Sequence, residues 1–172
     1  SYGDNSEADR SIMKKLGFDF NWNSCIGFDT GLRPNFGHTI LEEKEDGTLL
    51  ARDEQGLIVL EKPGVVSIPA EIGTSMTGRE AWEELYLPKL KWSAERVNTE
   101  YIKSLADDTN REIPIGLHCG SLIGYMRNLL GVEQLSYLYA DDEELYAEIV
   151  DTLAGICYQG VKTALETGAK FD

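Results

Sequence analysis

One short stretch constrains the fold of this chain more than any other. Residues 113–117, Ile-Pro-Ile-Gly-Leu, form an apolar run of the length of a buried β-strand. The turn His-Cys-Gly-Ser at residues 118–121 follows, and residues 122–130 then predict a helix that ends at Gly131. A strand, a short turn and a helix make a βα unit, so we expect an α/β fold with parallel strands.

The beginning of the chain predicts a second step of the same kind. Ser6 can cap a helix over residues 6–16, which ends at Gly17. The aromatic-rich residues 18–25 then predict a strand, and residues 27–37 contain glycine and proline breakers that predict a loop. A helix, a glycine and a strand are the αβ step of a βα-repeat fold.

Between residues 38 and 62 the apolar period changes to two, which is typical of β-strands. Two turn signatures, Asp46-Gly47 and Glu54-Gln55-Gly56, divide this region. Charged residues fall on both faces, so we expect the region to lie over a surface and not in the middle of a sheet. We expect an antiparallel meander of three strands, over residues 39–45, 48–53 and 57–62.

Two further segments predict continuous helices. Residues 77–86 begin with Thr77 as a plausible N-cap and stop before Pro88. Residues 93–109 place apolar side chains near one face of a helix. These side chains are Val97, Tyr101, Ile102 and Leu105.

A long helix is predicted near the end of the chain. It begins at Asp141, whose carboxylate can cap it, with Glu144 in the capping-box position, and it ends at Gly168. Residues 169–172 resemble the first residues of another strand. The apolar positions of the helix recur every three to five residues, at Leu145, Ile149, Leu153, Ile156, Val161 and Leu165.

The composition excludes several classes of protein. With 172 residues, of which 42% are hydrophobic and 27% charged, the chain has the proportions of one globular domain. Its net charge of -14, from 16 basic and 30 acidic side chains, would repel nucleic acids and anionic membranes. The sequence contains no run of about 18 uncharged apolar residues, which is the length needed to cross a bilayer.

The three cysteines lack the dense spacing of a disulfide scaffold, which indicates reduced thiols and a cytoplasmic protein. Cys25 and Cys157 have no motif around them, so we expect them to serve only in packing. The first residues carry no signal-peptide pattern and resemble a cut in the middle of a longer chain.

The turn after the apolar run carries the residues best placed for chemistry. In a (β/α) barrel the carboxyl ends of the strands form the active face, where His118 and Cys119 would lie. Zinc binding by both is disfavoured because adjacent residues of a strand point to opposite faces, so we assign no metal site. His118 is a candidate catalytic base, with a structural histidine as the alternative. Cys119 is a candidate nucleophile, but we favour a buried small residue.

Two arginines are candidates for substrate binding. Arg33 lies in the predicted loop and could bind a carboxylate through two hydrogen bonds, although a surface ion pair explains it equally well. For Arg127, on the helix after the apolar run, we expect an acidic partner, with ligand binding as the alternative. We expect five aromatic residues in the core: Phe18, Phe20, Trp22, Trp82 and Trp92.

Residues 113–131 resemble the mid-barrel segment of the uroporphyrinogen decarboxylase family, together with its divergent relatives, the corrinoid-linked methyltransferases. Other segments agree in order: the strand entry Leu-Gly-Phe-Asp at residues 16–19, a proline-then-acidic helix at 68–85, and the long helix that leads into the next strand at 141–172. The family is a (β/α)8 TIM barrel, which needs about 250 residues. The resemblance therefore implies one partial barrel domain over residues 1–172, with the meander at 38–62 as an insertion that caps its mouth.

The resemblance also implies roles for particular residues. Tyr125 matches the tyrosine that faces the tetrapyrrole, within a similar Leu-x-x-Tyr-Met context. The decarboxylases bind pyrrole N–H groups with an aspartate, and the nearest candidate is Asp29, which departs from the family position. The methyltransferase relatives hold zinc in the second half of their barrel. Zinc and a corrinoid would thus belong to the full-length protein, with no metal ligand in this chain.

Three functions follow from the resemblance. We favour corrinoid-dependent methyl transfer, in which Tyr125 and Arg33 position a corrinoid, a corrinoid protein or the methyl donor. The second is true uroporphyrinogen decarboxylation in porphyrin biosynthesis, in which Asp29 and Tyr125 hold the pyrroles and Arg33 holds a carboxylate. The third is a non-catalytic corrinoid-binding module or an inactive fragment. A half barrel exposes strand edges, so we expect homo-oligomers through that edge.

Overall fold

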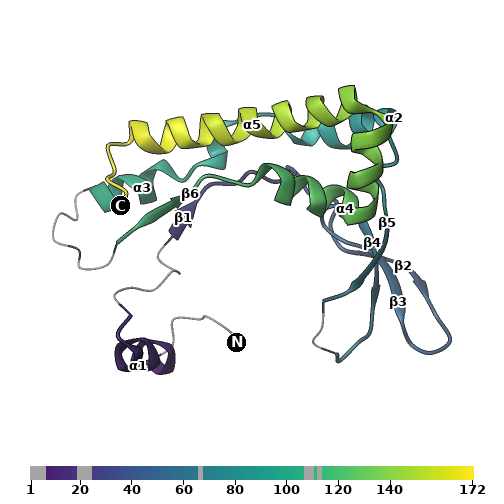
Figure 1. The fold of residues 1–172 in the computed structure, drawn as a ribbon, viewed down its shortest axis with the longest axis horizontal. Coiled ribbons are helices and arrows are strands. Elements are labelled where there is room, and N and C mark those ends of the chain that lie inside the picture. Colours follow the sequence, from purple (N-terminus) through teal and green to yellow (C-terminus); the bar gives the residue numbers. More distant parts are fainter. Residues whose placement is uncertain (1–6, 19–24, 66–67, 107–110, 112–113) are drawn as a thin grey trace. The chain divides into compact units, whose positions relative to one another are not determined.

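The computed structural model describes residues 7–18, 25–65, 68–106, 111 and 114–172 (Figure 1). The fold is mixed α/β, and the chain divides into two compact units. The first unit comprises Ser1–Asp29, Ala94–Gly120 and Tyr158–Asp172, and the second comprises Thr30–Ser93 and Ser121–Cys157. The described strands form a two-stranded parallel sheet in the first unit and a four-stranded antiparallel sheet in the second.

The sheet of the first unit is built from the apolar run and the strand near the start of the chain. β1 (Cys25–Gly27) pairs in parallel with β6 (Gly116–His118), with Ile26 opposite Leu117. This pairing confirms the expectation of parallel strands. β1 starts where the predicted strand 18–25 ends, and residues 19–24 and 112–113 lie outside the described residues.

The first helix has the predicted end. α1 (Glu7–Leu16) is followed by Gly17 at φ 74°, a conformation that favours glycine. The amide of Phe18 donates to the carbonyl of Met13, which closes the helix end as in a Schellman motif. Phe18 itself is 61% exposed, so the expectation that it lies in the core is wrong. The predicted cap Ser6, as well as Phe20 and Trp22, lie outside the described residues.

The continuous helix expected over residues 93–109 is wrong, because a 3-10 turn, η4 (Ala94–Arg96), is followed by a separate helix, α3 (Thr99–Ala106). Asn98 causes the break, since its Oδ1 accepts the amide of Tyr101 at 3.0 Å and so starts a new helix. Val97 and Ile102 are buried as expected, but Tyr101 is 52% exposed. Residues 107–110 lie outside the described residues.

The end of the chain lies beside β6. Residues 169–172 were expected to begin a strand, but the structure shows no strand there. Nevertheless, the amide of Asp172 donates to the carbonyl of Ile115 at 3.0 Å, and its carboxylate accepts the amide of Ile115 at 2.9 Å. Arg111 donates to the same carboxylate at 2.8 Å, and these hydrogen bonds from Arg111 and Ile115 lower the pKa of Asp172.

The sheet of the second unit contains the predicted meander and one strand more. β2 (Thr39–Glu43), β3 (Leu49–Arg52) and β4 (Leu57–Glu61) confirm the three expected strands and both turns. β5 (Ala70–Thr74) pairs with β4, in a segment where the resemblance implied a helix. The helical stretch begins only after β5, because the amide of Ser75 is bonded to Gly56 across the sheet.

One face of this sheet is apolar, contrary to the expectation that both are polar. Ala51, Leu57 and Val59 are buried together. The charged residues of β2 lie on an exposed edge strand instead, so only part of the meander lies open to solvent.

The segment after β5 forms three consecutive helical pieces. α2 (Arg79–Ala81) continues as a π-helix, η2 (Trp82–Tyr86), and then as a 3-10 turn, η3 (Leu87–Lys89). The first helical residue follows Gly78, at φ 145°, so the expectation of Thr77 as the cap is wrong. The change to 3-10 geometry coincides with Pro88, which cannot donate a helical hydrogen bond.

Two long helices carry the core of the second unit. α4 (Leu122–Asp141) is broken at Gly131 (φ 74°, ψ 166°), which confirms the predicted stop, but a second helical segment follows at once. α5 (Glu143–Glu166) is capped by Asp142, whose Oδ1 accepts the amide of Leu145 at 2.9 Å. Asp141 is therefore not the cap.

The buried stripe of α5 confirms the predicted period. Leu145, Ile149, Leu153 and Ile156 are buried, whereas Leu165 is 54% exposed. The first four join one core with residues of α4 and of the segment 76–90, in which Trp82 and Tyr86 are fully buried. Among the helices that the structure describes, none combines the length and the apolar character needed to cross a bilayer.

Candidate functional site

Two of the predicted site residues lie at the same edge of the parallel sheet. His118 is the last residue of β6 and lies opposite Gly27, the last residue of β1. Asp29 comes two residues after Gly27. The carboxyl ends of parallel strands meet at one edge, where α/β proteins place their ligands. The ring of His118 is exposed, and we find no hydrogen-bond partner for it in the described part of the chain. The structure thus brings His118 and Asp29 to one edge, but no carboxylate of the described residues is hydrogen-bonded to His118 to make it a general base.

Asp29 is held by a buried arginine. The amide of Asp29 donates to the carbonyl of Arg96 at 2.9 Å, and Arg96 Nη1 donates to the carbonyl of Asp29 at 3.3 Å. The same Nη1 lies 3.8 Å from the carboxylate, whose side chain remains 44% exposed. A carboxylate with this partner is fixed in position and still accessible to a donor from solvent. The nearby guanidinium attracts the negative charge of this carboxylate and so weakens it as an acceptor for N–H groups.

The donors near the turn do not make a zinc site. Within the described residues there is no group of three histidine, cysteine, aspartate or glutamate side chains that could hold a metal ion. Cys119 Sγ donates to the carbonyl of Leu117 at 3.4 Å and faces solvent. The expectation that Cys119 is buried is wrong, and Cys25, expected in packing, is exposed as well. Both residues lie near the open edge of a sheet of only two described strands.

Tyr125 and Arg33 belong to the second unit, where a hydrogen bond links their segments. The hydroxyl of Tyr125, on α4, accepts the backbone amide of Leu32 at 2.9 Å. Leu32 is buried, and the Tyr125 ring packs against the same core. Tyr125 therefore fixes the loop from which the exposed side chain of Arg33 extends. The amide of Arg33 also donates to the carbonyl of Lys89, which holds the loop on its other side.

Arg127 forms no hydrogen bond or ion pair with His118 or Asp29, nor with Tyr125 or Arg33, in the described part of the chain. It lies exposed on α4, and its Nη2 donates to the Oδ1 of Asn128 at 3.1 Å. The expectation of an acidic partner is wrong, because the neighbouring side chain in contact is a neutral amide.

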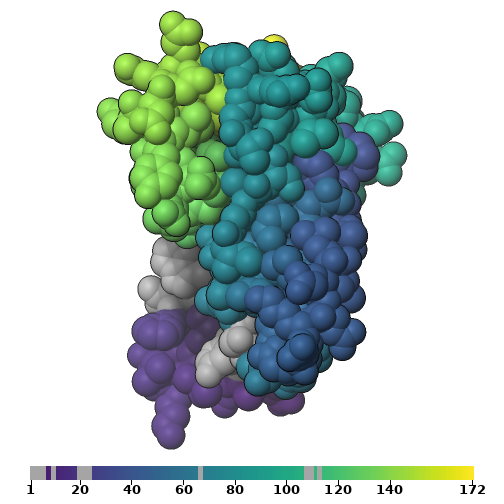
Figure 2. Space-filling model, turned by 90° about the vertical axis from the view of Figure 1, so that its right-hand side faces the viewer, coloured from purple at the N-terminus to yellow at the C-terminus, as the bar shows by residue number. Residues whose placement is uncertain are grey.

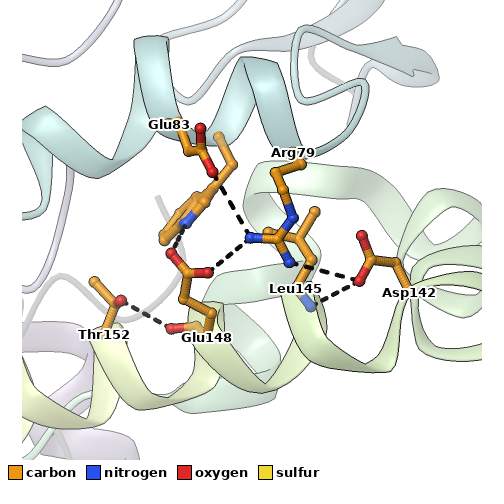
Figure 3. A network of polar contacts seen from close by, with 7 residues as sticks. Arg79, Glu83, Asp142, Leu145, Glu148 and Thr152 are labelled. Atoms are coloured by element: carbon orange, nitrogen blue, oxygen red, sulfur yellow. Dashed lines mark hydrogen bonds and ion pairs between the residues drawn. The ribbon is translucent and has the colours of Figure 1, made fainter.

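The polar contacts that the sequence did not reveal centre on Glu148 of α5 (Figure 3). Its carboxylate accepts the indole N–H of Trp82 at 2.9 Å and Arg79 Nη1 at 2.9 Å. Arg79 also lies 3.7 Å from Asp142 and 3.8 Å from Glu83. This network joins α2 and η2 to the first half of α5.

The charges of this network reinforce one another. Hydrogen bonds from Trp82, and then from Arg79, lower the pKa of Glu148, and the bond to Glu148 raises the pKa of Arg79. No signal in the sequence distinguishes Glu148, because Glu144 lies beside Leu145 of the same apolar stripe in the same way and is exposed. The partner of Glu148, Trp82, lies 66 positions away in the sequence.

Comparison with protein-family models, with curated proteins and with solved structures found no match to this chain. The comparisons therefore assign the chain to no family.

Proposed function

We propose that this chain forms the first part of a (β/α)8 barrel of the uroporphyrinogen decarboxylase-like family and that it contributes to binding a tetrapyrrole-type ligand. The observation that carries the proposal is the parallel pairing of β1 with β6. The hydrogen bond from Asp172 to Ile115 supports it, since a barrel would begin its next strand beside β6.

We favour corrinoid-dependent methyl transfer as the chemistry. In this proposal Arg33 binds a carboxylate of the corrinoid or of the methyl donor, and Tyr125 is a positioning residue that holds the Arg33 loop through Leu32. The pairing of Asp29 with Arg96 supports this choice over decarboxylation, because a carboxylate engaged with a guanidinium is a weaker acceptor for pyrrole N–H groups. The described residues do not fit zinc, so no step is assigned to a metal.

Uroporphyrinogen decarboxylation is the second candidate. It is favoured by the position of Asp29 at the carboxyl end of β1, where an exposed carboxylate could face the ligand. The two reactions are separated by incubating the complete protein with uroporphyrinogen under anaerobic conditions. Formation of coproporphyrinogen would contradict methyl transfer, and its absence together with methyl transfer to cobalamin would support it.

Binding can be tested on the chain itself, by titration with hydroxocobalamin and with uroporphyrin, followed by absorbance. If Arg33 binds a carboxylate, Arg33→Gln should weaken binding by about tenfold, the effect of losing one charged hydrogen bond. Lys44→Gln changes the net charge equally in an exposed turn of the meander and should have little effect. Equal effects of both variants, or no saturable binding, would contradict the proposal. Binding without turnover in the complete protein would instead favour a non-catalytic module.

The proposal includes self-association of the chain. The described parallel sheet has only two strands, and its outer face carries the small or exposed residues Cys25, Gly27, Gly116 and His118. The β1 edge of this sheet has no partner strand among the described residues, and an edge of this kind favours pairing with a second copy. Light scattering should show a dimer or larger species, and a monomer at all accessible concentrations would contradict this part of the proposal.

A further inference from the structure

Two cationic side chains lie around one aromatic ring at the base of the meander. The guanidinium carbon of Arg52 lies 5.3 Å from the ring centroid of Phe36, and Lys89 Nζ lies 5.0 Å from the same centroid. Both distances are within the range of a cation–π interaction. The three residues come from different segments of the second unit: the loop after β1, the end of β3, and η3.

One backbone and one side-chain hydrogen bond fix these segments together. The amide of Phe36 donates to the carbonyl of Glu54 at 3.0 Å, which attaches the loop to the turn between β3 and β4. Lys89 Nζ donates to the carbonyl of Pro34 at 3.1 Å, which attaches the same loop to η3. Figure 2 shows the surface of the meander, in blue, alongside that of the segment that follows it, in teal. The arrangement of the cations therefore belongs to the folded unit and not to chance contacts of long side chains.

One of the two cations lacks a counter-charge. Both cations lie about 5 Å from one ring centre, so they are at most about 10 Å apart. The chain carries 30 acidic residues, yet Arg52 forms no ion pair with any carboxylate of the described residues. The adjacent Asp53 instead accepts the amides of Gln55 and Leu57, both at 2.8 Å. A bound carboxylate would supply the counter-charge that Arg52 lacks among these residues.

Arg52 also has an unused hydrogen-bond donor. Its Nε is buried and has no hydrogen-bond partner in the part of the chain that the structure describes. A buried N–H without an acceptor is rare in folded proteins and often indicates a ligand or water that completes it. A guanidinium offers its donors in a planar fork that matches a carboxylate.

The backbone around the cluster argues for carboxylates and against a phosphate. Phosphate sites usually present several free backbone amides. Here the amides of Arg33, Phe36 and Gly37 already donate to Lys89, Glu54 and Asn35. Two separate side-chain cations that contact one aromatic ring suit an anion whose charges are also separated, with an apolar part that contacts the ring.

We propose that Arg52, Lys89 and Phe36 form a binding site for a small organic anion with two or more carboxylates. Arg52 binds one carboxylate through its fork, Lys89 binds another, and the Phe36 ring contacts the carbon skeleton between them. The inference goes beyond the proposed function, because the side chains of these three residues take no part in it.

The site can be tested by titrating the chain with tricarballylate and recording amide shifts by nuclear magnetic resonance. We expect saturable shifts at Phe36, Arg52 and the neighbouring turn, with affinity that falls as salt is raised. Arg52→Gln should weaken binding at least about tenfold, whereas Lys44→Gln, with the same change in charge, should leave it nearly unchanged. Arg52→Lys should bind between the wild type and Arg52→Gln, because it retains the charge without the fork.

Three results would overturn the proposal. The first is the absence of saturable shifts with tricarballylate. The second is an equal effect of Arg52→Gln and Lys44→Gln when the amide spectra show that both variants are folded. The third is tighter binding of inorganic phosphate than of tricarballylate. The cobalamin and uroporphyrin titrations are independent, so tetrapyrrole binding can fail while this site is retained, and the reverse also holds.

Discussion

At the scale of single residues, buried polar groups decide where the second unit gains or loses stability. Trp82 is fully buried, and its indole N–H needs an acceptor, which Glu148 supplies at 2.9 Å. Tyr86 is also fully buried, but its hydroxyl has no hydrogen-bond partner among the residues that the structure describes. Removing the acceptor Glu148 should therefore lower the free energy of unfolding, whereas removing the Tyr86 hydroxyl should not.

Replacing Glu148 by leucine should destabilise the protein by about 1–3 kcal/mol, because the buried indole N–H of Trp82 then lacks an acceptor. Glu148→Gln keeps an amide oxygen for Trp82 and should cost less. The measurement is urea unfolding at neutral pH, with Asp151→Asn on the exposed side of α5 as the control. The pKa of Glu148 is lowered from 4.5, so its contribution is present above that pH and is lost as the pH falls below it. Equal stability of the leucine and glutamine variants would contradict this account.

Tyr86→Phe should leave stability at neutral pH unchanged or slightly higher, because the hydroxyl has no described partner to lose. Burial raises the pKa of Tyr86 from 10.0 to about 12. Above pH 10 the unfolded chain therefore loses this proton before the folded chain does, and stability falls between pH 10 and 12. By pH 11 the wild type should lose about 1 kcal/mol more than Tyr86→Phe. Parallel alkaline losses in unfolding measurements of the two proteins would contradict the assignment.

At the scale of elements, helix ends are set by single polar residues and glycines that periodicity does not reveal. The apolar stripe of α5 was predictable because it recurs at helical spacing. Its cap was not, since Asp141 and Asp142 are chemically identical and only the structure shows which carboxylate reaches the amide of Leu145. The break at Asn98 has the same origin, because a capping side chain there overrides an apolar pattern that continues through it.

The choice of cap predicts a difference between two neighbouring aspartates. Asp142→Ala removes the hydrogen bond to Leu145, and with it the exposed 3.7 Å contact with Arg79 that contributes little, and should cost about 0.5–2 kcal/mol. Asp141→Ala removes an equal charge one residue away and should cost clearly less. Thermal unfolding of both variants checks the prediction, and a larger loss for the Asp141 variant would assign the cap to the wrong residue.

The kink in α4 predicts a difference between two glycines. Gly131 has φ 74° and ψ 166°, a region accessible almost only to glycine, and a Cβ there would lie 3.3 Å from Glu71 Oε2. Gly131→Ala should therefore cost about 1–3 kcal/mol. Gly155 lies inside α5, where an added Cβ would meet open space, so Gly155→Ala should stabilise by about 0.5–1 kcal/mol. Similar effects of both substitutions in urea unfolding would show that the kink is not strained.

At the scale of the whole molecule, the sequence predicted local elements well and their tertiary partners poorly. The meander and the βα unit carry strong local signals in their turns and periods. β5 does not, because Ala70–Thr74 becomes a strand only by pairing with β4. The candidate site was predictable in part, because His118 and Asp29 lie at the ends of paired parallel strands. The contact of Glu148 with Trp82 was not predictable, since it joins segments far apart in the sequence. The same holds for the contact of Arg52 with Phe36, which no local pattern indicates.

The net charge of -14 predicts how stability responds to salt. Raising the ionic strength from about 10 mM to about 100 mM shortens the Debye length from about 30 Å to about 10 Å, which screens repulsion between distant carboxylates. The ion pairs described here are mostly exposed and contribute little, so their weakening should not offset the gain. The melting temperature should therefore rise with sodium chloride. Replacing the exposed pair Glu42 and Glu43 by glutamine should reduce this rise, and a fall in melting temperature with salt would show that attractive pairs dominate instead.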